Sequence, residues 1–190
     1  MKKYVIVIAL LVMLSVTMSA TALMSKSINR ENGVSAYAYW EKTSTDSYEY
    51  TNLGVMKTDR GTDISVYTCK YDLDWNGNCK YGYAYTTKDV FTVDKKLNSA
   101  TLSTVNVDMY DWNTYEVITV PVQASWTGDG DLVRSIYRSI SKSSDFTFKY
   151  SGNVLYRNAI ATGTLDENDL GTSSYAEIDQ FKNAYMSMEK

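Results

Sequence analysis

Residues 118–126 read Ile-Thr-Val-Pro-Val-Gln-Ala-Ser-Trp, and this stretch decides the fold class. Every second residue in it is apolar, which is the pattern of a β-strand with one buried face: Ile118, Val120, Val122, Ala124 and Trp126. Pro121 has no backbone donor, so we expect it on an edge strand or at a bulge.

The same alternation recurs along the chain, with turn-type residues between the stretches. It is seen at 34–41, 64–71, 79–85, 90–93, 146–150 and 155–165. Between Ala100 and Met109 the alternation changes phase after Leu102, which predicts a one-residue bulge. The pattern predicts an all-β fold, an antiparallel β-sandwich of immunoglobulin-like or jelly-roll-like type with about 8–10 strands.

Two segments fit the strand pattern less well. Residues 131–142 fit both a strand and an amphipathic helix, and this sequence alone leaves the choice open. Ser174-Tyr175-Ala176-Glu177 matches a capping box, and an apolar stripe at helical spacing follows it. We therefore expect a short C-terminal α-helix at about 174–188.

The N-terminus resembles a secretory signal peptide. Lys2 and Lys3 precede an apolar run over 4–14, and Ala20-Thr21-Ala22 supplies small residues for cleavage. The run is short for a permanent span, which needs about 20 apolar residues. We expect a signal peptide at 1–22, a flexible leader at 23–33 and a single domain over 34–190. The mature protein is then secreted or extracytoplasmic, in the cell envelope, with no stable membrane span.

Charge and composition exclude several classes of function. The net charge is −3 and no block of Lys or Arg occurs, so we expect no nucleic-acid partner. The chain has no histidine, which removes Ser-His-Asp and Cys-His catalysis and the usual zinc hydrolase sites. Only carboxylate pairs remain for catalysis, and the candidates lie in turns: Asp129, Asp131, Asp166, Glu167 and Asp169. We expect a protein that is not an enzyme.

Cys69 and Cys79 are the two cysteines, and an extracytoplasmic pair predicts a disulfide. Two registers compete. A two-residue turn at Asn76-Gly77 offsets the cysteines too far for a bridge. The favoured register sets Cys69 opposite Cys79 and Tyr67 opposite Tyr81. It also gives the cysteine face a set of tyrosines: Tyr67, Tyr71, Tyr81, Tyr83 and Tyr85.

The loop between the cysteines resembles the first half of a calcium loop. Asp72, Asp74 and Asn76 place oxygen donors at alternate positions, and Gly77 follows. The position of the bidentate Glu is Tyr83, so an EF-hand is not supported. Two interpretations stay open, a solvated polar loop and a calcium site at Asp72, Asp74 and Asn76. Calcium is the only cofactor that the sequence suggests.

The chain is tyrosine-rich, with 17 Tyr and 4 Trp. Trp40 and Trp126 lie in alternating strands and are expected in the core. Trp75 and Trp112 lie in polar stretches, Asp74-Trp75-Asn76 and Asp111-Trp112-Asn113. An exposed Trp beside Asp and Asn suits a sugar or a protein hot spot, and the alternative is that both rings fold back over the ends of the fold.

These observations lead to one principal hypothesis and two others. The principal one is a secreted, non-enzymatic module that binds a glycan or protein at a cell surface, through Trp75, Trp112, Asp111 and Asn113. The alternative is a structural or assembly protein of the cell envelope whose C-terminal helix docks on a partner. The third is a carboxylate-dependent hydrolase.

Overall fold

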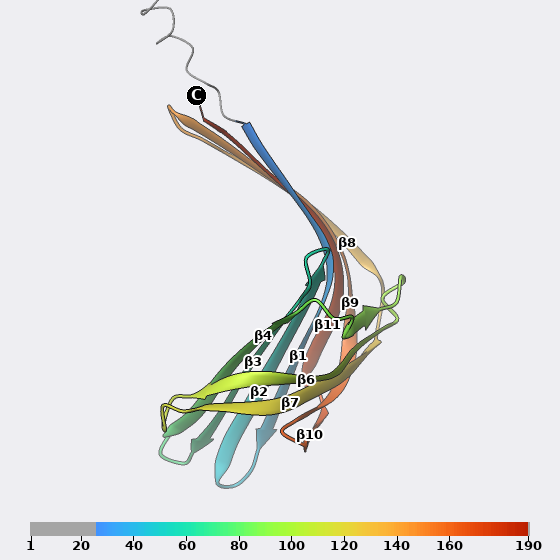
Figure 1. Cartoon of the computed structure of the whole chain (residues 1–190). Helices are drawn as coiled ribbons and strands as arrows, with labels where there is room; N and C mark the ends of the chain where they lie inside the picture. Colours follow the sequence, from blue (N-terminus) through green and yellow to red (C-terminus); the bar gives the residue numbers. More distant parts are fainter. Residues whose placement is uncertain (1–25, 190) are drawn as a thin grey trace, which may run out of the picture. The chain divides into compact units, whose positions relative to one another are not determined.

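Residues 26–189, which the computed structural model describes, form eleven β-strands and no helix (Figure 1). The strands are β1 (Lys26–Thr43), β2 (Ser47–Thr58), β3 (Thr62–Asp72), β4 (Gly77–Thr86), β5 (Phe91–Val93), β6 (Ser99–Asp111), β7 (Val117–Gly128), β8 (Val133–Lys142), β9 (Phe146–Leu165), β10 (Asn168–Thr172) and β11 (Tyr175–Glu189). The all-β prediction is confirmed. The predicted signal peptide at 1–22 lies outside the described residues.

All strands belong to one antiparallel sheet. Its pairing order runs β10-β9-β11-β1-β2-β3-β4-β6-β5, while β7 joins β6 to β9 and β8 pairs with β9. The path from β1 through β2, β3, β4, β6, β7, β9 and β11 therefore returns to β1. A closed path leaves these eight strands with hydrogen-bonded neighbours on both sides.

Contacts divide the described chain into two compact units. The larger one comprises Arg30–Tyr137 and Gly152–Asn183. The smaller one comprises 26–29, Arg138–Ser151 and 184–189. We expected a single domain over 34–190, and the smaller unit was not part of that expectation. Residues 26–33, expected as part of a flexible leader, form the start of β1 instead.

The core of the larger unit is built from the alternating apolar residues. They include Ala38 and Trp40 of β1, Leu53 and Val55 of β2, Ile64 and Val66 of β3, and Val122, Ala124 and Trp126 of β7. Burying such side chains contributes about 1.5–3 kcal/mol each for the larger ones. Each buried indole also finds an acceptor, since Trp40 donates to the Gly171 carbonyl (3.1 Å) and Trp126 to the Tyr37 carbonyl (3.0 Å).

One of two local predictions is confirmed. The register of β6 against β7 shifts between Leu102 and Val105, where the phase change predicted a bulge. Pro121 was expected on an edge strand or at a bulge, and this is wrong, because β7 lies between β6 and β9 and the partner of Pro121 in β6 is Asn106. Pro121 instead lies where the pairing of β7 with β9 ends, so its missing N–H interrupts no bond to β9.

The predicted helix at about 174–188 is wrong, because β11 occupies this segment. β11 has β9 on one side and β1 on the other, and these neighbours satisfy its backbone groups. Ala176 and Ile178 point into the core while Glu177 and Asp179 lie on the other face. The apolar residues of this segment fit both the helical and the strand periodicity, and pairing with β9 and β1 favours the strand.

Residues 131–142, for which the sequence left strand or helix open, contain a strand, β8. Residues 26–189 contain no helix that is long and apolar enough to cross a membrane.

Candidate functional site

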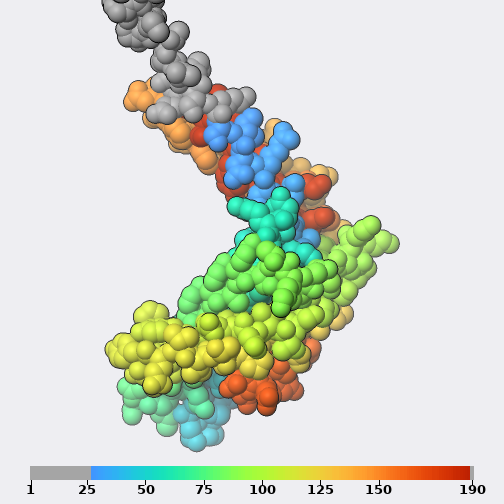
Figure 2. Space-filling model, in the orientation of Figure 1, coloured from blue at the N-terminus to red at the C-terminus, as the bar shows by residue number. Residues whose placement is uncertain are grey.

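The two turns that carry Trp75 and Trp112 lie next to each other. Residues 73–76 join β3 to β4, and 112–116 join β6 to β7. Because β4 pairs with β6, Lys80 lies opposite Asp111, and the Trp112 N–H donates to the Cys79 carbonyl (3.1 Å). In Figures 1 and 2 the two turns lie side by side at one end of the larger unit.

Both tryptophans are exposed, and each contacts a tyrosine. Trp75 is 73% exposed and lies 5.9 Å from the Tyr71 ring. Trp112 is 56% exposed and meets the edge of Tyr110 at 5.5 Å. Neither ring is buried, which argues against the alternative that both tryptophans fold back over the ends of the fold. The same end exposes further large apolar side chains: Leu73, Tyr115 and Val117.

The turn backbones hold aromatic residues in a conformation that favours glycine. The φ angle is 60° at Trp75 and 62° at Tyr115. A bulky residue with such an angle costs of order 1–3 kcal/mol, and such residues cluster at functional sites. The turns therefore present their rings at a cost in stability.

Asp111 shapes its turn. Its side chain is buried, and one carboxylate oxygen accepts the N–H groups of Asn113 (2.9 Å) and Thr114 (3.2 Å). The Lys80 ammonium lies 3.4 Å from the other oxygen. These groups, with the Asn113 N–H first, hold the pKa of Asp111 below its usual value. The Asn113 amide reaches back to the Gly77 carbonyl (3.4 Å) and so ties the two turns together.

Asp72 closes the turn between β3 and β4 in a similar way. Its carboxylate accepts the N–H groups of Asp74 (2.9 Å) and Asn76 (2.8 Å) and the Asn76 side-chain amide (3.0 Å). The bonds from Asn76 are the main cause of a lowered pKa at Asp72. Residues 26–189 contain no group of three or more His, Cys, Asp and Glu arranged for a metal. Calcium binding by Asp72, Asp74 and Asn76 stays a prediction, and a calorimetric calcium titration of the wild type against Asp74→Ala tests it.

The disulfide lies on the outer face of the sheet, directly behind these turns. Cys69 pairs with Cys79 and Tyr67 with Tyr81, so the favoured register is confirmed. The bridge is shielded because the hydroxyl of Tyr67 lies 3.0 Å from Cys69 Sγ and that of Tyr71 lies 3.9 Å from Cys79 Sγ.

Six aromatic residues form a continuous surface on this outer face, here called the aromatic ladder. Its members come from β1, β2, β3 and the turn after β3: Tyr39, Tyr48, Tyr50, Tyr67, Tyr71 and Trp75. Tyr50 lies at the centre, because its ring is 5.7–6.3 Å from four other tyrosine rings. Trp75 ends the ladder through Tyr71.

The hydroxyls of the ladder are joined to one another and to a carboxylate. The Tyr39 hydroxyl donates to Glu41 (3.0 Å), and the Tyr48 hydroxyl lies 2.8 Å from the Tyr39 hydroxyl and 3.4 Å from the Glu41 carboxylate. Burial, and then hydrogen bonding with Tyr67 and Tyr71, raises the pKa of Tyr50. The ladder thus presents neutral rings edged by hydroxyls and one acid.

Sequence reasoning found only part of the ladder. It assigned Tyr67 and Tyr71 to the cysteine face but missed Tyr39, Tyr48 and Tyr50. Their membership depends on the register of β2 with β1 and β3, which sets Tyr50 opposite Glu41 and Cys69. The alternation of Tyr48 and Tyr50 directly after the Ser44–Ser47 turn is the signal that could have identified them.

A cavity of about 270 Å³ lies on the inner face at the same end, here called the inner cavity. Its walls combine apolar residues, Met109, Ile118 and Leu165, with charged ones, Glu49, Lys70 and Asp166. Of the acidic turn residues, only Asp166 lines this cavity. Asp129 and Asp131 lie exposed in the loop after β7, and Asp169 accepts the Gly171 N–H (2.9 Å).

The comparisons with known proteins give no family. No protein-family model, no curated protein and no solved structure matches this chain.

Proposed function

We propose that this protein is a secreted, non-enzymatic module that binds a glycan at a cell surface through the aromatic ladder and the neighbouring Trp112. The observation that carries the proposal is Trp75: a strained, 73% exposed indole at the end of a row of contacting tyrosines. Exposed apolar rings held against their conformational preference support a binding role.

The chemistry of the ladder favours a polyhydroxylated ligand. Aromatic faces accept the apolar C–H side of a sugar ring, and polar groups at their edges bond its hydroxyls. Tyr39, Tyr48 and Glu41 supply such polar groups beside the rings. In this proposal Asp111 and Asn113 act by shaping the turn that carries Trp112.

The scaffold suits an extracytoplasmic module. We take it as sandwich-like, because the inner faces of β1–β3 and of β6–β7 share one apolar core. The Cys69–Cys79 disulfide is compatible with an oxidising compartment and holds two strands of the ladder face together.

A glycan array followed by titration calorimetry tests the proposal. Wild-type protein should bind at least one class of glycan, and Trp75→Ala should weaken that binding at least about tenfold. Trp112→Ala should weaken it less, because Trp112 contacts Tyr110 and not the ladder. Phe146→Ala removes an exposed ring from β9 and serves as the matched control, with unchanged affinity expected.

Two results would overturn the proposal. One is a wild-type protein that binds nothing on the array. The other is binding that survives Trp75→Ala and Tyr50→Ala together, because the ligand then lies elsewhere on the protein.

A second candidate function, assembly with further copies of this chain, rests on β8. Among the strands that residues 26–189 form, this strand pairs with β9 alone, and nearly all its residues are exposed, with Ile136 at 62% and Ile140 at 61%. Exposed edge strands are templates for pairing with another chain. The C-terminal helix that we expected to dock is absent, so β8 takes its place in this candidate. Light scattering of wild type and Ile140→Lys tests it, and a monomer at all concentrations contradicts self-assembly.

A further inference from the structure

A trough crosses the outer face one row away from the ladder, and Gly54 forms its floor. In this row Tyr37 lies opposite Gly54, Gly54 opposite Ser65, and Ser65 opposite Tyr83. The two central residues have almost no side chain, which leaves a hollow of about 270 Å³. The next row, Tyr39, Asn52 and Tyr67, contains two rings of the ladder. The two features are therefore adjacent.

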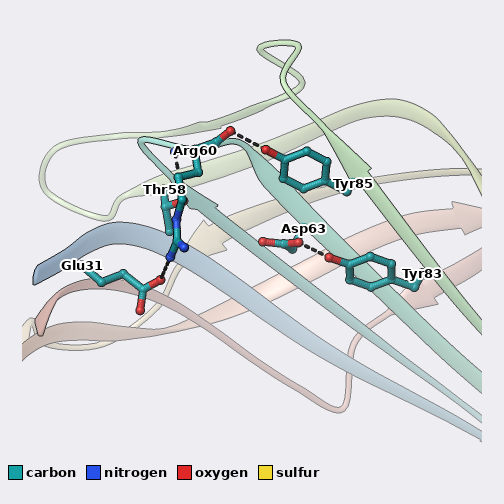
Figure 3. A network of polar contacts seen from close by, with 6 residues as sticks. All are labelled: Glu31, Thr58, Arg60, Asp63, Tyr83 and Tyr85. Carbon is teal, nitrogen blue, oxygen red and sulfur yellow. Dashed lines mark hydrogen bonds and ion pairs between the residues drawn. The ribbon is translucent and has the colours of Figure 1, made fainter. Parts of the chain in front are cut away.

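Two tyrosines wall the Gly54 trough on opposite sides. Tyr37 and Tyr83 are three strands apart, which corresponds to about 14 Å between their backbones. The Tyr37 hydroxyl donates to Asn52, and the Tyr83 hydroxyl donates to Asp63 (Figure 3). These bonds restrain both rings, so the walls are ordered before a ligand arrives.

The charged groups of the trough are of one sign. Asp63 and Asp179 line it, and no lysine or arginine is found among its described lining residues. The cations nearby are paired outside it, Arg60 with Glu31 (2.7 Å; Figure 3) and Lys57 with Asp89. An anionic ligand would meet two carboxylates without a compensating charge.

Asp179 is held in this trough at a cost to the fold. Burial, and then the neighbouring Glu177, raises its pKa to about 6, although the Ser35 hydroxyl donates to it (3.4 Å). A carboxylate whose charge the folded protein opposes is more typical of a ligand site than of a stabilising contact.

We propose that the Gly54 trough holds one hexose unit of the glycan, neutral or amine-bearing, between Tyr37 and Tyr83. Asp63 and Asp179 accept hydrogen bonds from its hydroxyl or ammonium groups. The trough does not bind uronic acids, because their carboxylates would lie next to those of Asp63 and Asp179. This inference rests on the proposed function, because the trough extends the ladder, and it adds the class of sugar.

Filling the floor of the trough tests the inference. Gly54 lacks the left-handed backbone that only glycine tolerates, and an added Cβ would meet only the Ser65 hydroxyl, at 2.9 Å. A serine side chain rotates easily, and valine is favoured in strands, so Gly54→Val should fold with an unchanged or higher melting temperature. Ser125→Val, on the outer face of β7, is the matched control.

The probes are a cello-oligosaccharide, a chitosan oligosaccharide and an oligogalacturonate, titrated by calorimetry. Wild type and Ser125→Val should bind the first, the second or both, and not the third. Gly54→Val should lose at least about tenfold in affinity, since the ring no longer enters. Asp63→Asn with Asp179→Asn should weaken the chitosan oligosaccharide more than the cello-oligosaccharide and admit the oligogalacturonate.

The outcomes separate the two proposals. If Gly54→Val binds like wild type while Trp75→Ala does not bind, the trough inference is wrong and the ladder proposal stands. Preferential binding of oligogalacturonate by the wild type also overturns the trough inference alone. If no glycan binds the wild type, both proposals fall.

Discussion

Cys69 and Cys79 lie directly opposite each other where β3 pairs with β4, with their Cα atoms 4.1 Å apart, on the outer face of the sheet. The bridge closes the turn that carries Trp75 and lies beneath the hydroxyls of Tyr67 and Tyr71. The only covalent cross-link among the described residues thus supports the proposed binding surface.

Removing the disulfide should weaken both the fold and the binding. Replacing both cysteines with serine removes a cross-link between residues that are 10 positions apart in the sequence. A cross-link that closes a loop of this length stabilises the folded protein by about 3 kcal/mol. Urea unfolding should show this loss. Dithiothreitol should lower the unfolding midpoint of the wild type to that of the double variant. It should leave the midpoint of the double variant unchanged. Equal midpoints for wild type and double variant would contradict the prediction.

Tyr50 should contribute through its ring more than through its hydroxyl. Tyr50→Ala removes the centre of the ladder and should destabilise the protein by about 1–2 kcal/mol, because cross-strand aromatic pairs stabilise sheets. Tyr50→Phe keeps the ring contacts and should cost less than about 1 kcal/mol. Thermal unfolding measures both effects, and glycan affinity should follow the same order. A larger loss for Phe than for Ala would show that the hydroxyl dominates.

The pKa of Asp179 makes stability depend on pH in a defined direction. Its folded-state value of about 6 exceeds the ordinary 3.8, so the folded protein binds this proton more tightly. The contribution is fully present below about pH 4 and is lost as pH rises through 6. The groups around Asp179 are Glu177 and Tyr175 on its own strand, the Ser35 hydroxyl, and Asp63 and Tyr83, which line the same trough.

Asp179→Asn should therefore raise stability at pH 7.5 by about 1–2 kcal/mol, a value reduced by partial solvent screening. The gain should vanish near pH 4. Urea titrations at both pH values measure it, with Asp131→Asn, an exposed loop residue, as the control. A variant less stable than wild type at pH 7.5 would mean that the Ser35 bond outweighs burial.

Trp126 should be the most costly core side chain to shorten. It is 1% exposed, meets the edge of Phe91 at 6.1 Å and donates to the Tyr37 carbonyl. Trp126→Phe leaves a cavity and removes the indole hydrogen bond to the Tyr37 carbonyl, which together cost about 2–3 kcal/mol. Chemical unfolding measures this loss. A loss of less than about 1 kcal/mol would contradict the prediction, because it would show that the core repacks around the smaller ring.

Lys70→Ala should leave glycan binding unchanged. Lys70 lies on the inner face beside Tyr71 and lines the inner cavity, whereas the ladder lies on the outer face. Affinity within about twofold of wild type is expected, since single surface changes away from a contact have small effects. If Lys70→Ala loses glycan binding while Trp75→Ala keeps the wild-type affinity, the glycan binds in the inner cavity and not on the ladder.

The sequence predicted the elements whose information is local. Alternation identified the strands around Trp40, Cys69 and Trp126, and the phase change after Leu102 predicted the bulge. The register of Cys69 with Cys79 followed from one hairpin, because one register alone gives a coherent face. The segment after Ser174 was misassigned because both periodicities fit it, and only pairing with distant β1 and β9 decides between them.

The sequence by itself determined the alternation of buried and exposed residues, the cysteine pair and the presence of two polar turns bearing tryptophan. Only the tertiary structure decided that β4 pairs with β6 and brings those turns together, and that Tyr50 lies among rings of β1 and β3. It also decided that Asp179 joins Asp63 around Gly54. The reason is physical: alternation needs only neighbours in the chain, whereas each of these juxtapositions depends on the register between strands far apart in sequence.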